Sequence, residues 1–410
     1  MRSFLLFLLI GAIVGEIYTF IAVRTAVKAK WISWVYLAIS LVIIAYIIYS
    51  FTKFDRSVGQ TKTTLFTIGL MLITVIPKML IGIVLLGEDL FRIFTGCMRA
   101  FLGESDQPFL TARREFVSKV GFGIAAVPFL SLLYGMTKGK YNFKVRKRTV
   151  FFADLPSGFD GLTITHISDI HSGSFEDKEE IEHAIDLINQ QKSDIILFTG
   201  DIVNTHAEEM HPWIETFKRI ETPAFGKYSV LGNHDYGEYV TWPSQREKQK
   251  NFEDIKDLHR QIDFKLLLNE HIKLQKDGQE IAIVGVENWG RNFKQAGDLG
   301  KASAGLSPED FKILMSHDPS HWDEEVRHHK NNYRLTLSGH THGLQFGIEI
   351  PGFIKWSPVQ YVYKQWAGLY ENAGRYIYVN RGFGFHAYPG RVGIWPEITV
   401  LQLKKAQKVG

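Results

Sequence analysis

Long apolar runs are confined to the first third of the chain. Four of them, at about 4–23, 32–51, 64–86 and 117–136, are each long enough to cross a bilayer core of ~30 Å as a helix. After Tyr141 the pattern changes to short alternating or fully apolar strands between amphipathic helices, which is typical of an α/β domain. The 410 residues therefore predict a membrane region at 1–140, a basic linker at 141–149 and a globular domain at 150–405.

Two charged residues lie deep within the apolar runs, Glu16 in the first and Lys78 in the third. Helices that alternate in direction place them at similar depth, so we expect them to form an ion pair. Charges inside a membrane also raise the hypothesis of a transport pathway. The structural ion pair is the preferred interpretation, because two residues do not make a relay.

In the globular part, apolar strands end repeatedly in Asp, Asn or His. The stretch "LTITHISDIH" alternates as a half-buried strand does and delivers Asp169 and His171, which point the same way because residues two apart in a strand share a face. Later strands end in the same manner at Asp201, Asn233, His317, His340 and His342. Ligands of open α/β sheets bind at the carboxyl ends of strands, so these side chains are predicted to form one site.

The composition narrows the chemistry of that site. The chain has one cysteine and 15 histidines, so its donors are oxygen and nitrogen, which suit Zn, Mn, Fe or Co. The donors are too many for one ion with an open position, which favours two ions, and two ions ~3.5–4 Å apart suit in-line phosphoryl displacement. The net charge of +4, without a sustained basic face, argues against a nucleic-acid partner.

Taken together, the blocks resemble the calcineurin-like metallophosphoesterase superfamily. The matching blocks occur in order: Asp-x-His at 169–171, Gly-Asp at 200–201, Gly-Asn-His-Asp at 232–235, His-Asp at 317–318 and Gly-His-x-His at 339–342. The opening "DGLTITHISDIH" and the ending "YVNRGFG…PEITVLQL" are similar to the bacterial branch that is membrane-anchored or exported by a twin-arginine signal. The resemblance implies an α/β/β/α sandwich of two mixed β-sheets flanked by helices, placed after a four-helix transmembrane bundle.

The resemblance also implies roles for individual residues. It assigns the ligands of two metal ions bridged by Asp201: Asp169, His171 and His342 for the first, and Asn233, His317 and His340 for the second. A metal-bridging water or hydroxide would attack phosphorus, His234 would give a proton to the leaving oxygen, and Asp235 would orient His234. One departure concerns Leu344, because relatives often have Gly at this position of the Gly-His-Thr-His block.

Residues outside the metal set are candidates for substrate contacts. Arg381 and Arg391 could bind a phosphate through bidentate hydrogen bonds, and a structural salt bridge is the alternative for Arg381. His206 follows the Gly-Asp block closely and is a further candidate.

The segment 344–370 is unusually aromatic and contains Phe346, Phe353, Trp356, Tyr361, Tyr363, Trp366 and Tyr370. Trp and Tyr favour membrane interfaces, because one end of the side chain is apolar and the other is hydrated. We expect this segment to lie at the rim of the site and to contact lipid or the apolar part of a lipid phosphoester. Local packing of a long insertion is the alternative.

Two functions follow from these patterns. The first is a membrane-anchored hydrolase of a phosphoester or pyrophosphate, with a lipid or envelope-derived substrate favoured. The second is a transporter or sensor whose phosphoesterase-like domain is regulatory.

The side of the membrane rests on the stretch "TARREF" before the fourth run, which resembles a twin-arginine signal and would place the globular domain outside a bacterial cytoplasm. Ordinary flanking arginines are the alternative. The Lys and Arg residues near the ends of the apolar runs number ten on one side and eight on the other, which does not decide the orientation.

Overall fold

The computed structural model describes residues 2–103 and 111–406, and the side chains of 11–103 and 112–406. The chain divides into two compact units. The first contains residues 1–54 and 66–137, and the second contains residues 55–65 and 138–410.

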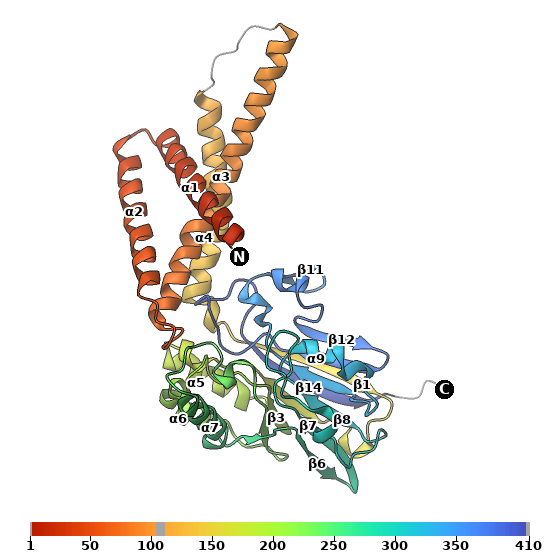
Figure 1. Cartoon of the computed structure of the whole chain (residues 1–410). Coiled ribbons are helices and arrows are strands. Elements are labelled where there is room, and N and C mark those ends of the chain that lie inside the picture. Colours follow the sequence, from red (N-terminus) through yellow and green to blue (C-terminus); the bar gives the residue numbers. More distant parts are fainter. Residues whose placement is uncertain (1, 104–110, 407–410) are drawn as a thin grey trace. The chain divides into compact units, whose positions relative to one another are not determined.

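The first unit is helical (Figure 1). Its helices are α1 (Arg2–Ala26), α2 (Trp31–Thr52), α3 (Lys62–Leu102) and α4 (Thr111–Thr137). Among the residues whose side chains are described, three helical stretches are long and apolar enough to span a membrane: Trp31–Thr52, Lys62–Leu102 and Ala112–Thr137. The start of the first predicted apolar run, residues 4–10, lies outside the residues whose side chains are described.

The predicted ion pair between the deep charges is confirmed. Lys78 Nζ lies 2.6 Å from Glu16 Oε2. Ser40 and Tyr36 donate hydrogen bonds to the same carboxylate at 2.8 and 3.0 Å. Each charged group is thus met by partners inside the bundle, which fits the structural interpretation of the pair.

The paired arginines before the fourth apolar run also have partners within the first unit. Arg114 is buried and forms ion pairs with Glu88 and with Asp89, whose Oδ1 lies 2.7 Å from its Nη1. The more exposed Arg113 lies 3.7 Å from Glu88. Arg114 therefore has a structural role in joining α3 to α4.

The second unit contains two mixed six-stranded sheets. The first sheet has the order β1 (Lys144–Phe152), β14 (Glu397–Lys405), β2 (Thr163–Ile167), β3 (Ile195–Phe198), β4 (Lys227–Ser229) and β5 (Lys265–Leu266). The second has the order β12 (Gly368–Asn372), β13 (Arg375–Val379), β9 (Leu335–Ser338), β8 (Lys312–Met315), β7 (Gln279–Gly285) and β6 (Glu270–Lys276).

The sheets and helices of this unit form four layers. Between the sheets lies an apolar core to which both contribute, for example Ile164 and Leu197 from one and Ile313 and Leu337 from the other. The helices α5 (Lys178–Asn189), α6 (Ile214–Lys218) and α7 (Gln245–Gln261) cover the outer face of the first sheet. The short helices α8 (Leu299–Ala302) and α9 (Pro319–Glu324) cover the second. This is the predicted α/β/β/α sandwich.

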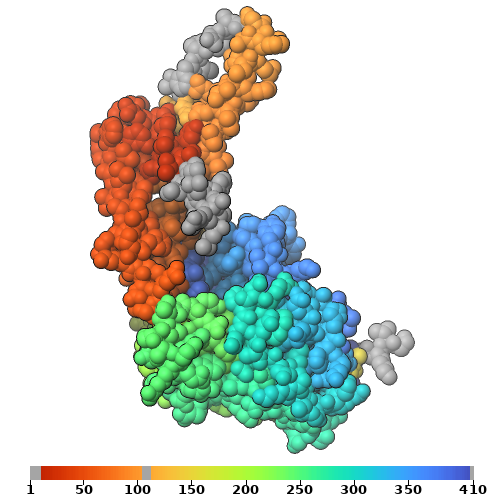
Figure 2. Space-filling view, in the orientation of Figure 1, coloured from red at the N-terminus to blue at the C-terminus, as the bar shows by residue number. Residues whose placement is uncertain are grey.

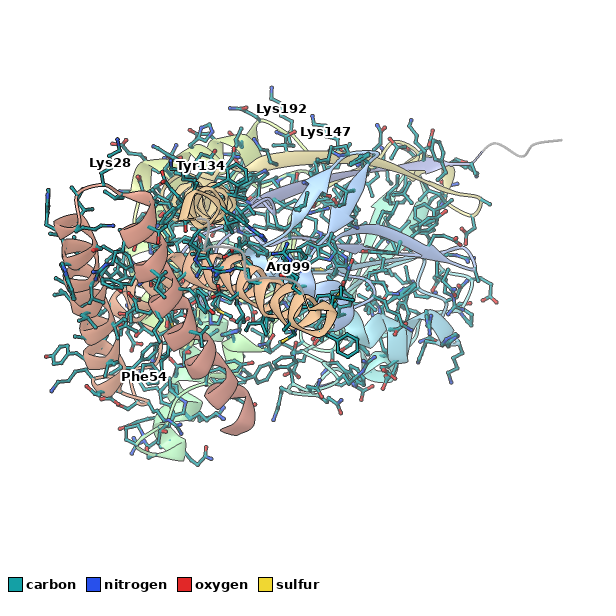
Figure 3. The ribbon with its side chains drawn as sticks, turned by 90° about the horizontal axis from the view of Figure 1, so that it is seen from above. Lys28, Phe54, Arg99, Tyr134, Lys147 and Lys192 are labelled. Atoms are coloured by element: carbon teal, nitrogen blue, oxygen red, sulfur yellow. The ribbon has the colours of Figure 1, made fainter. Side chains whose placement is uncertain are left out.

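The expected basic linker at 141–149 needs correction, because residues 144–152 form the edge strand β1. The whole strand pairs in parallel with β14. Its basic side chains are tolerated because an edge strand can direct them to solvent, as Lys147 does in Figure 3. Val150 and Phe152 at the end of the strand are buried in the core between the sheets.

A second correction concerns residues 55–65, which were expected within the membrane region and belong to the second unit. The Arg56 carbonyl accepts a hydrogen bond from the Thr241 N–H at 2.9 Å. The Gln60 side-chain oxygen accepts one from the Ala387 N–H at 3.0 Å. Leu65 is fully buried in the same core cluster as Phe385. The segment is therefore a fixed part of the globular fold.

Candidate metal centre

The predicted metal ligands meet at one edge of the sandwich. Parallel strands β2, β3 and β4 of one sheet end just before Asp169, Asp201 and Asn233, and parallel strands β8 and β9 of the other end before the histidines. Across the two sheets, His171 Nε2 lies 3.0 Å from His342 Nε2, and Asn233 Oδ1 lies 3.1 Å from His317 Nε2. The predicted convergence of the strand ends is confirmed.

The backbone at these strand ends is strained. Several candidate ligands adopt left-handed conformations, with φ between 48° and 68°: Asp169, His171, Asp201, His340 and His342. Each such residue costs about 1–3 kcal/mol when it is not glycine, so the surrounding fold must impose the conformation. Strain of this kind gathers at functional sites, and here it gathers on the residues that the sequence selected.

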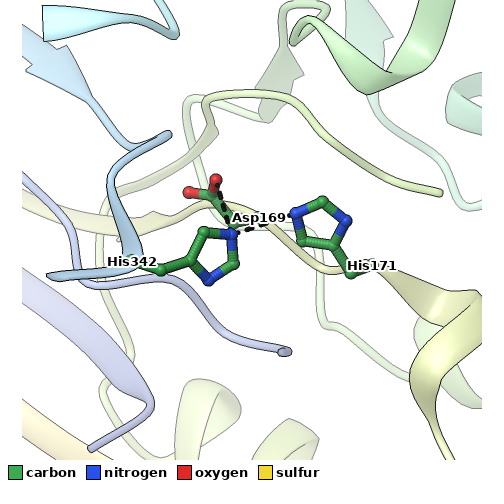
Figure 4. A group of neighbouring side chains, drawn as sticks. All are labelled: Asp169, His171 and His342. Atoms are coloured by element: carbon green, nitrogen blue, oxygen red, sulfur yellow. Dashed lines mark hydrogen bonds and ion pairs between the residues drawn. The ribbon is translucent and has the colours of Figure 1, made fainter. Parts of the chain in front are cut away.

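The candidate ligands fall into three overlapping groups whose donor atoms lie within 4.8 Å of one another. The first is Asp169, His171 and His342, which Figure 4 shows directed toward a common point. Another is Asp201, His317 and His340, beside Asn233. Asp201 belongs also to the third group, with His171 and His234. A carboxylate shared between groups is what a bridging ligand requires.

The buried carboxylates of the site favour the binding of cations. Asp169 and Asp201 are buried, and although burial acts to raise their pKa values, His342 and His317 hold them below the usual range. Burial by itself lowers the pKa of His317. The negative charges of Asp201 and Asp169 outweigh this effect and raise that pKa to about 10. Two buried carboxylates thus favour positive charge at this place in the site. Divalent ions with oxygen and nitrogen ligands fit this charge and this donor set.

Hydrogen bonds behind the ligands fix which nitrogen faces the centre. Nδ1 of His317 lies 2.6 Å from the Thr199 carbonyl, and Nδ1 of His171 lies 3.1 Å from the Asn204 side-chain oxygen. Donation from Nδ1 leaves Nε2 of both rings with a free lone pair. His340 is arranged in the opposite way, because its Nε2 lies 2.9 Å from the Tyr363 hydroxyl and its Nδ1 faces Asn233.

Comparison with known proteins agrees with this geometry. The family described as "Calcineurin-like phosphoesterase" matches residues 162–344, and "Probable Calcineurin-like phosphoesterase, transmembrane domain" matches residues 1–140. The Bacillus subtilis (strain 168) protein "Uncharacterized metallophosphoesterase YkuE" is 32% identical over 301 residues, which cover 72% of this chain and 98% of that one. This chain belongs to the calcineurin-like metallophosphoesterase family. It is a membrane protein and a metal-dependent phosphoesterase.

Other similar proteins share parts of this metallophosphoesterase. The Danio rerio "Transmembrane protein with metallophosphoesterase domain" is 26% identical over 283 residues, which cover 67% of this chain and 60% of that one. Among solved structures, a 5'-nucleotidase precursor from Thermus thermophilus covers 59% of this chain and 54% of its own, at 12% identity and a TM-score of 0.34. A likeness this low carries no argument about substrate.

The expected contact between Asp235 and His234 needs correction. The Asp235 carboxylate accepts the backbone N–H groups of Asp201, Ile202 and Gly232 at 2.8–2.9 Å. It therefore braces the two turns that present Asp201 and Asn233. The His234 ring is oriented by Asn204 instead, whose carbonyl lies 2.7 Å from Nδ1. Burial, and then the nearby Asp201, raise the pKa of Asp235 to about 7.

In this metallophosphoesterase, the residues predicted to contact substrate interact with other parts of the fold instead. Arg381 is buried and ion-paired with Glu349 and Glu397, which is the alternative that the sequence left open. Arg391 is fully buried and donates to main-chain carbonyls, among them that of Gly382. His206 begins a 3-10 helix, where its ring packs on Trp242 with centroids 5.1 Å apart.

Sequence reasoning missed several residues that contact the site. Asn204 holds both His171 and His234, and Asp318 lies 3.4 Å from Nε2 of His340. Tyr239 stacks on His234 with ring centroids 4.3 Å apart. The His-Asp pair at 317–318 was a usable signal for Asp318, whereas the others depend on loop conformations that no local pattern specifies.

A cavity of about 640 Å³ opens beside Asn233. Aromatic rings and polar groups line it together: Glu238, Tyr239, Asn292, Phe293, Lys294 and Gln295. Phe293 also packs edge-on against His340, at 4.7 Å between ring centroids. The cavity therefore adjoins both His234, through Tyr239, and the second ligand group, and it is roomy enough for the group attached to a phosphate.

Proposed function

We propose that this metallophosphoesterase hydrolyses a phosphoester of a lipid or of the cell envelope with the help of two divalent transition-metal ions. The observation that carries the proposal is the convergence of all seven predicted ligands, with Asn233 beside His317 and His340 and with Asp201 within reach of both His171 and His317. A regulatory domain in a transporter or sensor would have no need of this complete set together with an ordered His234. The membrane-spanning region supports a substrate that is itself in or near a membrane.

Each residue has a task that its contacts support. When bound, the metal ions supply a water activated near neutral pH and neutralise the phosphoryl oxygens. Asp201 holds the two halves of the site together, and Asn233 adds an oxygen donor without adding charge. His234 is held through Nδ1 by Asn204 and flanked by the rings of Tyr239 and His386, so that Nε2 of the protonated imidazole can give its proton to the leaving oxygen. The cavity beside Asn233 accommodates the leaving group.

Metal removal tests the proposal directly. Chelation should abolish hydrolysis by the purified full-length protein, and Mn, Zn, Fe or Co should restore it, because the buried carboxylates and imidazoles supply the donors for such ions. Elemental analysis and a panel of phospholipids, sugar phosphates, nucleotides and pyrophosphate provide the measurement. Active wild-type protein that contains no transition metal would contradict the proposal.

We also propose that the globular domain lies outside the cytoplasm of a bacterial cell. The support is the Arg113–Arg114 pair before the last apolar run, although Arg114 has a structural role as well. A protease added to intact spheroplasts should then digest the globular domain. Protection in spheroplasts together with cleavage in inverted vesicles would reverse the assignment.

A further inference from the structure

A short hairpin that follows the last metal ligands has its polarity inverted. Strands β10 (Ile348–Ile350) and β11 (Ile354–Trp356) pair antiparallel with each other. Along β10 the apolar Ile348 and Ile350 are exposed, whereas the charged Glu349 between them points inward. Hairpins in water show the reverse order, with polar side chains outward. Strands that face lipid put their apolar side chains outward.

The inverted orientation is fixed by ion pairs. Glu349 accepts hydrogen bonds from Arg381 at 2.6 Å and from Arg146 at 2.7 Å. Arg381 also pairs with Glu397 at the start of β14. Turning the hairpin over would place Glu349 in solvent and leave buried Arg381 with one carboxylate fewer. Removing a partner from a buried charge destabilises a fold more than breaking an ion pair on the surface does. The outward direction of the isoleucines is therefore imposed by the fold.

Exposed apolar side chains continue on both sides of this hairpin. Phe353 at its turn is 85% exposed, and Tyr361 beyond it is 78% exposed. The blue atoms of this part of the chain lie at the surface in Figure 2. We call the set the apolar rim, and it consists of Leu344, Phe346, Ile348, Ile350, Phe353, Ile354, Tyr361 and Val362. Exposed apolar residues gathered in one short segment are typical of an interaction site.

Leu344 joins the apolar rim to the metal centre. It lies two residues after His342, has φ +48° and ψ +19°, and is exposed. A leucine in this left-handed region costs about 1–2 kcal/mol, which glycine would not. The chain thus accepts both backbone strain and an exposed leucine beside a ligand of the site. An exposed leucine in a strained conformation improves neither the stability nor the solubility of the fold, so its presence indicates a role in binding.

The aromatic residues of 344–370 divide between two roles, so the expectation that the segment as a whole contacts lipid needs correction. Trp366 is buried in a small cluster with Val359, Ala367 and Ile394. Tyr363 supports His340 through its hydroxyl. The most exposed aromatic residues are Phe353 and Tyr361 instead.

We propose that the apolar rim enters the interfacial layer of a lipid bilayer and presents the metal centre to phosphates at the membrane surface. The bilayer is the chosen occupant because the same chain carries membrane-spanning helices. The charges also fit: Lys364 is exposed within the segment 344–364, while Glu349, its only acidic residue, is paired inward. An exposed cation beside exposed Tyr and apolar side chains complements lipid phosphates above acyl chains.

Site-specific labelling tests the position of the rim. The chain has a single cysteine, Cys97, so a Cys97→Ser background accepts one label at Phe353→Cys or, as a control on the exposed part of β6, at Lys276→Cys. An environment-sensitive dye at 353, in protein reconstituted into phosphatidylcholine–phosphatidylglycerol vesicles, should shift to the blue and be quenched by spin-labelled lipid. The dye at 276 should be quenched by aqueous iodide instead. Quenching of both dyes by iodide to the same extent would overturn the proposal. So would a blue shift at 353 that depends on protein concentration, which would indicate a second copy of the chain.

A second experiment measures activity and therefore rests on the proposed function. The double variant Ile350→Ser/Phe353→Ser should raise KM for a phospholipid ester in vesicles by roughly tenfold or more, because two apolar contacts with lipid are lost. Hydrolysis of p-nitrophenyl phosphate should stay unchanged. A parallel loss with both substrates would show that the rim serves the fold, against the proposal. If the wild-type protein hydrolyses neither substrate, the proposed function fails while the labelling result still stands.

Discussion

Replacing Asp201 by Asn should leave the purified protein with little bound transition metal and should lower its turnover by more than about a hundredfold. The carboxylate lies within reach of both ligand groups, 3.1 Å from Nε2 of His317 and 3.6 Å from Nε2 of His171. Its loss leaves Asp169 as the only carboxylate among the predicted ligands. Elemental analysis and steady-state hydrolysis of the same preparations provide the measurement.

The Asn variant keeps the shape of the site. The Asp201 carboxylate also accepts the N–H of His234 at 2.8 Å, and an amide oxygen can accept it as well. Asp254→Asn, on the exposed surface of α7, changes the charge of the protein by the same amount away from the centre. If Asp201→Asn retained full metal content and activity, the shared carboxylate would not be a bridging ligand.

Replacing His234 by Ala should have the opposite signature, with metal content kept and turnover lowered by roughly 10²–10⁴-fold. The ring is held by Asn204 and flanked by Tyr239 and His386, which suits a proton donor with one fixed nitrogen. Loss of a general acid matters most when the leaving group is a poor one. The decrease should therefore be large for an alkyl phosphoester and small for p-nitrophenyl phosphate, whose leaving oxygen needs little protonation.

Two results would contradict this role. Equal losses with alkyl and aryl substrates would mean that His234 does not protonate the leaving group. A loss of metal would make His234 a ligand, which its place in a group with His171 and Asp201 also permits. His183→Ala is a suitable control, because it removes an exposed imidazole on α5 that belongs to none of the ligand groups.

The cluster of candidate ligands was predictable because its geometry follows from strands. Parallel strands end at a common edge, so an Asp, Asn or His placed just after each strand must meet its counterparts, as Asp169 and His317 do. The sandwich followed from the resemblance in the same blocks. The residues around the ligands were less accessible, because Asn204 and Tyr363 act from loops whose paths depend on tertiary packing.

The errors have a common physical origin. Basic residues at 144–148 looked like a linker, since composition does not distinguish an edge strand with solvent-facing lysines from a flexible segment. Arg381 looked like a phosphate contact, because a sequence does not show that two carboxylates from distant strands will reach it. Asp235 looked like a partner of the adjacent imidazole, but neighbours in sequence at a sharp turn point apart.

The placement of residues 55–65 within the globular unit makes that fold discontinuous in sequence. Its two pieces, 55–65 and 138–410, are separated by residues 66–137. Residues 66–137, with α4 and most of α3, are thus an insertion into the phosphoesterase, and the chain passes between the units at three points instead of one. A fragment that begins at Lys138 lacks Leu65 from the core and Gln60 from the loop that carries His386. For this enzyme, the catalytic half and the membrane half are therefore not separable by a single cut.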